Sequence, residues 1–329
     1  MPKSENTRSR RTAVRAGCAI ALTGVCAGLV PGAVQGEEKK LLIGIVELQL
    51  TNPFFDSLKK SAIDTAKKNG LDVMTAEANT AGDSATQITA IENMINRGVK
   101  GITLDPANAT ALVPIVKKAR DAGIVVVTTN TSLAPMTAAD AAYETDNLQA
   151  GVLIGQWAKA TMGSKSVHIA MLDYDLSDKT SKARHDGFLK GFGIAEGDPQ
   201  IAGSALNMGN AETGQTAMEN LLSAHPDINV IYTINEPAAQ GAFFAIKKAK
   251  RDVLVTSIDG SCSGVRSIAD GTIGATVMQF PIRMGEMAVD DGVKPSGFHN
   301  TGTVLITDHP VAGVDSKDSK WGLENCWGK

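Results

Sequence analysis

The sequence predicts an α/β protein of parallel sheets with flanking helices, and three observations support this fold class. Short apolar runs alternate with segments of helical periodicity from residue 41 to about residue 290. Most of the apolar runs lack polar alternation, as expected of strands that are buried on both faces of a parallel sheet. The 293 residues that follow residue 36 are enough for roughly two domains. We therefore expect two domains whose strands are joined by right-handed crossovers.

Residues 1–36 differ from the rest of the chain and are typical of an export signal. A basic start, with five Lys and Arg residues against Glu5, precedes an apolar segment at residues 16–30 that is short for a membrane span. A stretch of small and helix-breaking residues follows, and we expect cleavage near Gly36. The twin-arginine signature at residues 9–11 is incomplete, because larger apolar residues usually follow it. The export route therefore stays open.

The composition of residues 37–329 argues against some classes of partner. These residues carry 27 Lys and Arg against 34 Asp and Glu, a net charge of −7, and they contain no basic run. We therefore expect no nucleic-acid partner. The five histidines, at positions 168, 185, 225, 299 and 309, lack the spacing of metal ligands, so we expect no metal site.

The first predicted strand, residues 41–47, leads through a loop into a helix. Asn52 is placed to cap this helix, because its side-chain oxygen can accept a backbone N–H. Pro53 suits the first helical turn, where no backbone donor is needed. Apolar residues recur on one face at positions 58, 62 and 66, and we expect the helix to end at Gly70.

Two adjacent aromatic residues, Phe54 and Phe55, lie at the start of this helix. The chain has 8 Phe, 3 Tyr and 3 Trp residues, so neighbouring rings at the carboxyl end of a strand are unusual for it. Ligands of open α/β sheets bind at those carboxyl ends. We interpret the pair as a ligand contact. The alternative is a hydrophobic staple that places one ring in the core.

The next elements follow the same alternation. Residues 84–97 show helical periodicity, with isoleucines at 88, 91 and 95 on one face, Asp83 as the predicted N-cap and Gly98 at the end. Short apolar runs predict the remaining strands at residues 72–76, 101–104, 124–129, 167–172, 201–206, 230–233, 253–258 and 275–278.

Polar residues directly follow the apolar run at six of these strand ends. Carboxylates accept hydrogen bonds and side-chain amides both donate and accept them, which matches the hydroxyl groups of a sugar. Each residue alone has an ordinary alternative role, since Asp and Asn favour caps and turns. Together they indicate a ligand rich in hydroxyl groups. The six residues are Asp105, Asn130, Asp173, Asn235, Asp259 and Gln279.

Motifs for catalysis are weak in this sequence. No predicted strand is followed by the glycine pattern of a dinucleotide site or by a phosphate-binding loop. Residues 260–264, GSCSG, lie between a strand and a helix, as a nucleophile elbow does, with Cys262 as the nucleophile. In an exported protein, however, a disulfide between Cys262 and Cys326 is the default expectation. We expect no enzyme and no cofactor, with the elbow as the alternative.

Arg184 lies in a helix predicted at residues 179–191. Its neighbours include Lys182, Asp186 and Lys190, and this pattern favours a solvated charge. The alternative is a guanidinium group that binds sugar hydroxyls.

Several motifs, in order along residues 40–310, resemble the ribose-binding-protein family of periplasmic sugar receptors. They are TNPFF at 51–55, YETDN at 143–147, ARHDGF at 183–188, NLLSAHP at 220–226, NEP at 235–237, IDG at 258–260 and Gln279. Within that family the chain is most similar to fructose-binding proteins of ABC importers. That similarity rests on GFLKGFGI at 187–194, YTINEPAA at 232–239, SIDG-x-C at 257–262, IGAT-x-MQ at 273–279 and the tail LITD…CWG.

The resemblance implies a clamp of two similar lobes, each a parallel sheet with flanking helices, joined by three hinge crossovers. By that likeness the chain crosses near residues 145–146, 279–280 and 304–305. The N-terminal lobe would comprise residues 37–145 plus 280–304, and the C-terminal lobe residues 146–279 plus 305–329. The helix from residue 281 to about 290 looks shorter than its counterpart in the family.

The family's ligand contacts carry over to nine residues of this sequence. This changes the interpretation of Arg184 from a solvated charge to a ligand contact. The aromatic rings would stack on the apolar C–H face of the sugar, and the polar groups would bind its edge. The nine residues are Asn52, Phe54, Phe55, Asp105, Asn130, Arg184, Asn235, Asp259 and Gln279.

Two departures from the ribose receptors argue for a sugar of a different shape. Those receptors carry Asp-Arg after the fourth strand, where this chain has Asn130 and Thr131. They also carry a phenylalanine where this chain has Gly209. Tyr174, which follows Asp173, is a candidate for the missing stacking surface.

The resemblance thus implies a periplasmic sugar-binding component of an ABC importer, with fructose favoured as the ligand. The implied partners are the monosaccharide and the membrane permease, and we expect a monomer that acts by lobe closure. Three alternatives stay open. The ligand could be a pentose, another hexose or a polyol; the protein could serve only as a chemoreceptor ligand carrier; or it could be a Cys262-dependent hydrolase.

Overall fold

The computed structural model describes residues 40–48, 52–78, 80, 82–290 and 295–328. The chain divides into residues 1–39 and a compact unit of residues 40–329, and only the second is described below. The expected export signal and its cleavage near Gly36 lie outside the described residues.

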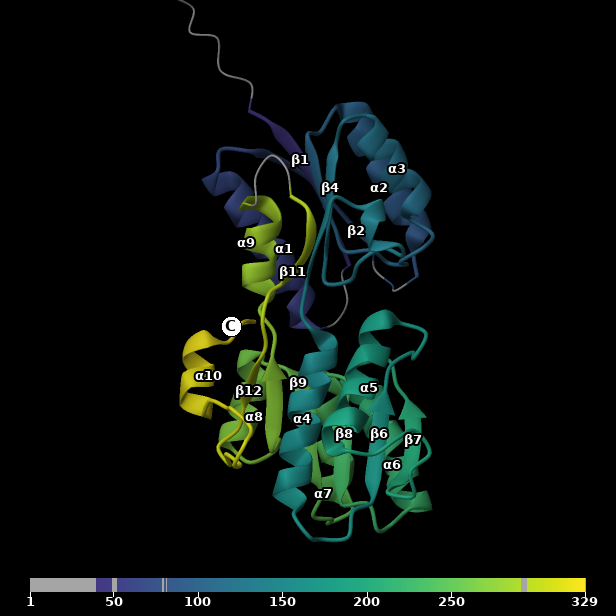
Figure 1. Cartoon of the computed structure of the whole chain (residues 1–329), viewed down its shortest axis with the longest axis vertical. Coiled ribbons are helices and arrows are strands. Elements are labelled where there is room, and N and C mark those ends of the chain that lie inside the picture. The colour runs from purple at the N-terminus through teal and green to yellow at the C-terminus, as the bar shows by residue number, and fades with distance from the viewer. Residues whose placement is uncertain (1–39, 49–51, 79, 81, 291–294, 329) are drawn as a thin grey trace, which may run out of the picture. The chain divides into compact units, whose positions relative to one another are not determined.

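A first sheet of six strands has the order β11-β5-β4-β3-β1-β2, and all its strand pairs are parallel. Helices α1 (Pro53–Lys68) and α9 (Pro281–Asp290) cover one face of this sheet, and α2 (Ser84–Arg97) and α3 (Val113–Asp121) cover the other (Figure 1). A short 3-10 helix, Met136–Ala138, precedes β5. The strands are β1 (Leu42–Leu48), β2 (Asp72–Ala78), β3 (Gly101–Leu104), β4 (Val125–Thr129), β5 (Ala141–Glu144) and β11 (Gly297–Asn300).

A second sheet of six strands has the order β12-β10-β9-β8-β6-β7. Helices α4 (Asn147–Met162) and α5 (Lys179–Phe192) cover one face, while α6 (Ala211–Ala224), α7 (Glu236–Lys248) and α8 (Cys262–Ala269) cover the other. The short helix α10 (Ser319–Asn325) packs on α8. The strands are β6 (Ile169–Asp173), β7 (Ile201–Leu206), β8 (Val230–Thr233), β9 (Leu254–Asp259), β10 (Ala275–Met278) and β12 (Val304–Ile306).

This architecture confirms the predicted α/β fold of two sheets with flanking helices. The chain passes from one sheet to the other after β5, after β10 and after β11. Only the pairing of β10 with β12 is antiparallel among the described strands. The chain arrives from β11 beside the carboxyl end of β10, where β12 starts. β12 then runs along β10 toward the amino end of that strand, so the two strands are antiparallel. The predicted strand boundaries are correct to within a few residues.

Local sequence explains where the first helices begin and end. Oδ1 of Asn52 accepts the backbone N–H of Phe54 at 3.0 Å, which caps α1. Oδ1 of Asp83 caps α2 by accepting the backbone N–H of Thr86 at 3.1 Å. Gly98 closes α2 with a φ of 73°, a conformation that glycine adopts without steric cost. The predicted caps are confirmed, and the first of them fixes the two aromatic rings at the carboxyl end of β1.

A buried ion pair joins the end of β6 to α5. Nδ1 of His185 lies 3.0 Å from an Asp173 oxygen, and Nε2 lies 2.8 Å from the exposed carboxylate of Glu196. The hydrogen bond to Asp173 raises the pKa of His185 from 6.5 to about 9. Burial raises the pKa of Asp173, and His185 opposes that rise. The folded protein therefore holds His185 as an imidazolium at neutral pH.

We expect the free energy of unfolding to fall as the pH rises from 6.5 to about 9. Over that range the folded protein keeps a proton on His185 that the unfolded chain has released. His185→Gln should remove this pH dependence, which totals ~3 kcal/mol over that range. Denaturant unfolding at about pH 6 and about pH 9.5 measures it. Glu196→Gln, which changes only the exposed partner, should keep most of the slope. Parallel pH profiles for wild type and His185→Gln would contradict the assignment.

Candidate ligand-binding site

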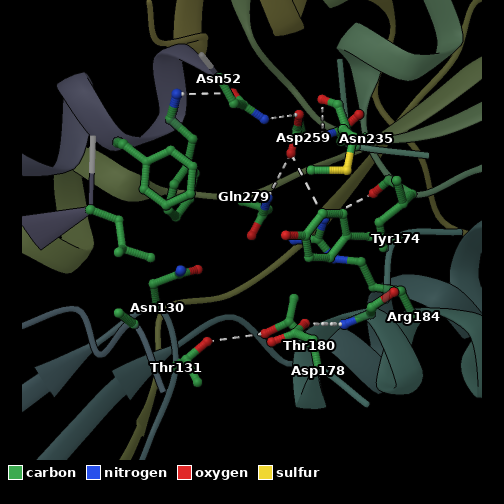
Figure 2. Close-up of a pocket in the computed structure, with 18 of the residues that line it drawn as sticks. Asn52, Asn130, Thr131, Tyr174, Asp178, Thr180, Arg184, Asn235, Asp259 and Gln279 are labelled. Atoms are coloured by element: carbon green, nitrogen blue, oxygen red, sulfur yellow. Dashed lines mark hydrogen bonds and ion pairs between the residues drawn. The ribbon is translucent and has the colours of Figure 1, made fainter. Parts of the chain in front are cut away.

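A cavity of about 180 Å³ lies between the carboxyl ends of the strands of the two sheets (Figure 2). Eight of the nine residues predicted to contact a ligand line it, and so does Tyr174. The eight are Asn52, Phe54, Phe55, Asn130, Arg184, Asn235, Asp259 and Gln279. The other lining residues are Leu48, Pro106, Ala107, Thr131, Asp178, Thr180, Ser181, Met208, Gly209 and Ile234.

The start of α1 brings two aromatic rings to the cavity. The rings of Phe54 and Phe55 meet edge to face, with centroids 5.4 Å apart. Phe54 is buried in the core between α1 and the first sheet, whereas Phe55 is half-buried. Phe54 is therefore a core residue, as the alternative interpretation expected, and it also forms part of the cavity wall. Contact of the two rings with a ligand stays a prediction.

The buried carboxylate of Asp259 lies at the centre of a hydrogen-bond network (Figure 2). Its Oδ2 accepts from Nδ2 of Asn52 at 2.8 Å, and its Oδ1 accepts from Nε2 of Gln279 at 2.9 Å. Nη1 of Arg184 lies 3.9 Å from Oδ1. Burial raises the pKa of Asp259, and the positive charge of Arg184 opposes that rise. Because Asn52 caps a helix of the first sheet and Asp259 ends a strand of the second, the network joins both sides of the cavity.

Arg184 is 6% exposed, so the interpretation of this residue as a solvated charge is wrong. Its Nε donates to Oδ1 of Asn147 at 2.8 Å, and its Nη1 donates to the carbonyl of Ile234 at 2.9 Å. Lys182 and Asp186, on the same helix, pair with each other in solvent. Within the described part of the chain, no hydrogen bond engages Nη2 of Arg184. Its N–H groups can therefore serve an acceptor in the cavity.

Asn235 caps a helix and lines the cavity at the same time. Its Oδ1 accepts the backbone N–H of Ala238 at 3.0 Å, which caps α7, and its Nδ2 donates to the carbonyl of Gly209 at 2.9 Å. Gly209 has a φ of 66°, which glycine tolerates. A Cβ at position 209 would lie 2.9 Å from Nδ2 of Asn235. A side chain there would therefore push Asn235 out of its present position.

Asp105 is the one predicted contact residue that does not line the cavity. Its carboxylate is fully buried and accepts from Nδ2 of Asn130 at 3.2 and 3.3 Å. Asn130, which does line the cavity, has a φ of 61°, a left-handed conformation that Asn adopts more readily than most residues. In this structure Asp105 therefore reaches the cavity through Asn130, and its direct contact with a ligand stays a prediction.

A second buried carboxyl group, Glu47 on β1, lies near Asp105. Its side chain is fully buried, and neither oxygen has a hydrogen-bond partner among the described residues. Burial raises the pKa of Glu47 well above its usual value, and the charge of Asp105 adds to the rise. Burial also raises the pKa of Asp105 well above its usual value. Burial and the neighbouring Asp105 thus both disfavour the charged form of Glu47.

The start of α5 also forms part of the cavity wall, which the sequence did not indicate. Oδ1 of Asp178 accepts the backbone N–H of Ser181 at 2.8 Å and caps the helix. The hydroxyl of Thr180 lies 3.3 Å from that of Thr131, which follows β4 of the first sheet. The spacing of Asp178 and Ser181 is a readable cap signal. Nothing in the local sequence, however, indicates that this cap faces residues some 50 positions away.

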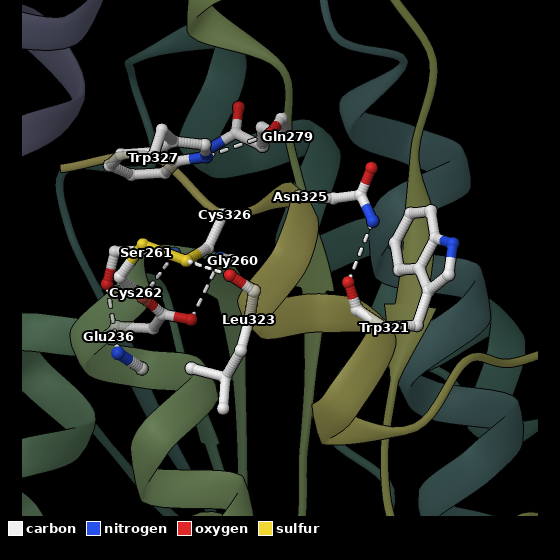
Figure 3. The surroundings of a disulfide bond; sticks show 11 residues. Glu236, Gly260, Ser261, Cys262, Gln279, Trp321, Leu323, Asn325, Cys326 and Trp327 are labelled. Carbon is white, nitrogen blue, oxygen red and sulfur yellow. Dashed lines mark hydrogen bonds between the residues drawn. A yellow bond between two sulfur atoms is a disulfide. The ribbon is translucent and has the colours of Figure 1, made fainter. Parts of the chain in front are cut away.

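Cys262, at the start of α8, is bonded to Cys326 in a disulfide (Figure 3). It is also buried, so its sulfur is not available as a nucleophile. The turn before α8 is held instead by the carboxylate of Glu236, which accepts the backbone N–H groups of Gly260 and Ser261 at 2.8 and 3.0 Å. The turn that suggested a nucleophile elbow thus has a structural role.

In the described ranges, no helix has the length and apolar character needed to cross a bilayer. Nor do three or more His, Cys, Asp or Glu side chains of those ranges come together in a way that could hold a metal ion.

Residues 43–294 match the family model of the periplasmic binding protein domain. The chain is 32% identical over 255 residues to the ribose import binding protein of Bacillus subtilis, across 78% of this chain and 81% of that protein. An ABC transporter periplasmic solute-binding protein from Actinobacillus succinogenes 130z, solved with bound D-allose, has a TM-score of 0.73 and 25% identity over 82% of this chain and 98% of that one. The periplasmic binding component of the arabinose ABC transporter from Shewanella sp. ANA-3, bound to L-arabinofuranose, has a TM-score of 0.72 and 25% identity. The match covers 80% of this chain and 91% of that one.

The family match includes every residue that lines the cavity, from Leu48 to Gln279. The relatives named above are binding proteins of ribose import or of ABC transporters and are not enzymes, which agrees with the prediction for this chain. The two-sheet fold, the cavity between the sheets and the extent of these matches together show that the chain belongs to the periplasmic binding protein family.

Proposed function

We propose that the protein is the periplasmic sugar-binding component of an ABC importer and that its ligand is fructose. The observation that carries the proposal is the network around Asp259. Asn52 from a helix of the first sheet and Gln279 from the end of a strand of the second act on the same buried carboxylate. A small polyhydroxylated ligand held at this point would contact both sides of the cavity at once.

The chemistry of the lining supports a sugar as the ligand. Phe54 and Phe55 supply apolar surface for the C–H face of a ring. Arg184 offers N–H donors, and Asn235 and Gln279 offer amide groups that suit hydroxyls. A cavity of about 180 Å³ restricts the ligand to a small molecule. The named relatives, which bind ribose, D-allose or L-arabinofuranose, support the same class of ligand.

Two features favour fructose over ribose. The motifs that resemble fructose-binding proteins lie in the second sheet and its flanking segments, and they supply the cavity residues Asn235, Asp259 and Gln279. The chain also has Gly209 where ribose receptors carry a phenylalanine, and Tyr174 lines the cavity nearby. Loss of one ring and gain of another at a different position would suit a ketohexose, which carries one more hydroxymethyl group than a pentose.

The mechanism we propose is a population shift between open and closed arrangements of two lobes. We place the N-terminal lobe at residues 37–145 plus 280–304 and the C-terminal lobe at residues 146–279 plus 305–329. The membership of β11 in the first sheet and of β12 in the second supports these boundaries. A sugar that contacts both lobes stabilises the closed arrangement, which the membrane permease would then recognise.

Calorimetric titration with a panel of sugars tests the proposal. The protein should first be unfolded and refolded to remove any sugar that copurifies. We expect D-fructose to bind with a dissociation constant of about 1 µM or lower, which is about −8 kcal/mol. If ribose, allose or arabinose binds more tightly than fructose, the proposed ligand is wrong but the proposed sugar-binding function stands. Failure of every monosaccharide and polyol to bind would overturn the function itself.

Asp259→Ala should weaken sugar binding by ~1–3 kcal/mol or more, because it leaves the donors of Asn52, Gln279 and Arg184 without their shared acceptor. Calorimetry on the folded variant measures the loss. Asp186→Ala is the matched control, since this exposed carboxylate pairs only with Lys182 in solvent. It should bind as wild type does. Equal affinity of Asp259→Ala and wild type would count against Asp259 as a ligand contact.

Tyr174→Ala should cost ~0.5–1.5 kcal/mol of sugar affinity if the ring is a stacking surface. Tyr174→Phe keeps the ring and should bind nearly as wild type does. A loss of the same size in both variants would instead assign the effect to the hydroxyl group. No loss in either variant would remove Tyr174 from the set of contacts.

A further inference from the structure

The C-terminal segment after α10 carries a tryptophan that the proposed function does not use. Trp327 is 2% exposed and does not line the cavity, yet it contacts two residues that do, Gln279 (Figure 3) and Phe54. Its Nε1 donates to the backbone carbonyl of Gln279 at 2.9 Å. Its ring meets that of Phe54 edge to face, with centroids 5.8 Å apart.

The backbone of Trp327 is tied to the second sheet. The preceding residue, Cys326, forms the disulfide with Cys262 at the start of α8. The carbonyl of Trp327 accepts the backbone N–H of Cys262 at 2.8 Å, and the segment forms a parallel bridge at Ser261. A covalent bond and a hydrogen bond thus fix the position from which the indole projects.

The indole itself packs on the first sheet. It belongs to the apolar cluster that α1 and α9 form against that sheet, together with Leu58, Tyr143 and Met284. The backbone of Trp327 is therefore attached to the second sheet, while its indole is buried against the first sheet. The ring of Phe54 thus meets both the indole and the ring of Phe55 edge to face.

We propose that Trp327 is a positioning residue of the ligand cavity. The disulfide holds the C-terminal segment in place. The indole packs against the ring of Phe54 and donates a hydrogen bond to the backbone carbonyl of Gln279, which restrains both residues. The side chain of Gln279 donates to Asp259, so one indole sets the relative position of the aromatic wall and of the polar network. This inference rests on the proposed function only for the effect on sugar affinity. The alternative is a tail that covers apolar surface without any effect on the cavity.

A double-mutant cycle tests the positioning of Phe54 without any sugar. The free energy of unfolding is measured for Trp327→Leu, Phe54→Leu and the double variant. Contacting residues give non-additive effects, so we expect the double variant to lose less stability than the two single losses predict. The matched control replaces Trp327→Leu by Trp321→Leu. Trp321 lies on α10 and packs on the core of the second sheet, whereas Phe54 belongs to the cluster on the first sheet, so that cycle should be additive.

Sugar affinity tests the consequence for the cavity. We expect Trp327→Leu to weaken binding roughly three- to tenfold, which corresponds to the worth of one aromatic pair. Trp327→Phe restores a ring beside Phe54 and should recover most of the affinity. Cys262→Ser with Cys326→Ser keeps the indole but releases its anchor, and it should weaken binding in the same direction. Trp321→Phe should change affinity less than about twofold.

The two measurements separate the possible outcomes. An additive cycle, or wild-type affinity in a folded Trp327→Leu variant, would overturn the inference and leave the sugar-binding function intact. If the cycle is non-additive but the protein binds no sugar, the coupling of Trp327 to Phe54 stands and the proposed function is wrong. If Trp327→Leu does not fold, the cycle is run with Trp327→Met, which also removes the ring, and an additive result in that variant is again decisive.

Discussion

A carboxylate that is buried in a protein has to be paired, because its desolvation costs several kcal/mol that only charged or hydrogen-bonding partners can offset. Asp259 is such a group, and the rest of the site follows from its pairing. Its oxygens accept from Asn52 and Gln279, and Arg184 supplies the opposite charge. These partners come from α1, from the residue after β10 and from α5. The requirement of one buried charge therefore draws three separate elements, on both sheets, to a single point.

Features that depend on neighbouring residues could be predicted from the sequence. The alternation of strands and helices indicated the fold class, and the caps at Asn52 and Asp83 need only the residues beside them. Four of the six strand-end residues could be placed at the cavity for the same reason, since parallel strands place their carboxyl ends at one edge. Asp105 and Asp173 do not line it, because Asn130 and His185 respectively bind their carboxylates. Asn235 shows the limit of this reasoning. It is an ordinary helix cap and a cavity residue at once, so the two interpretations did not exclude each other.

Features that depend on distant residues could not be predicted in this way. Arg184 looks solvated among charged neighbours, but its helix turns it toward Asn147 and Ile234, 37 and 50 positions away. Asp105 sits at a strand end like Asp259, yet the backbone conformation of Asn130 places an amide in front of it. Trp327 meets Phe54 only because the disulfide brings the end of the chain back to the second sheet. In each case a tertiary contact decides the role.

The hydrogen bonds that offset the desolvation cost of the buried Asp259 carboxylate also limit what this residue can contribute to sugar selectivity. A carboxylate has about four acceptor positions, and the backbone N–H of Glu236 is a further donor to Oδ2, at 3.3 Å. A sugar hydroxyl therefore has to share Asp259 with the protein donors or displace one of them. Displacement adds little to the binding free energy, because one hydrogen bond replaces another. Groups whose hydrogen bonds are not saturated, such as Nη2 of Arg184, and the rings of Phe55 and Tyr174 do not incur this exchange. Discrimination between sugars of similar polarity should therefore reside in the donors and the aromatic walls, while Asp259 sets a level of affinity common to all of them.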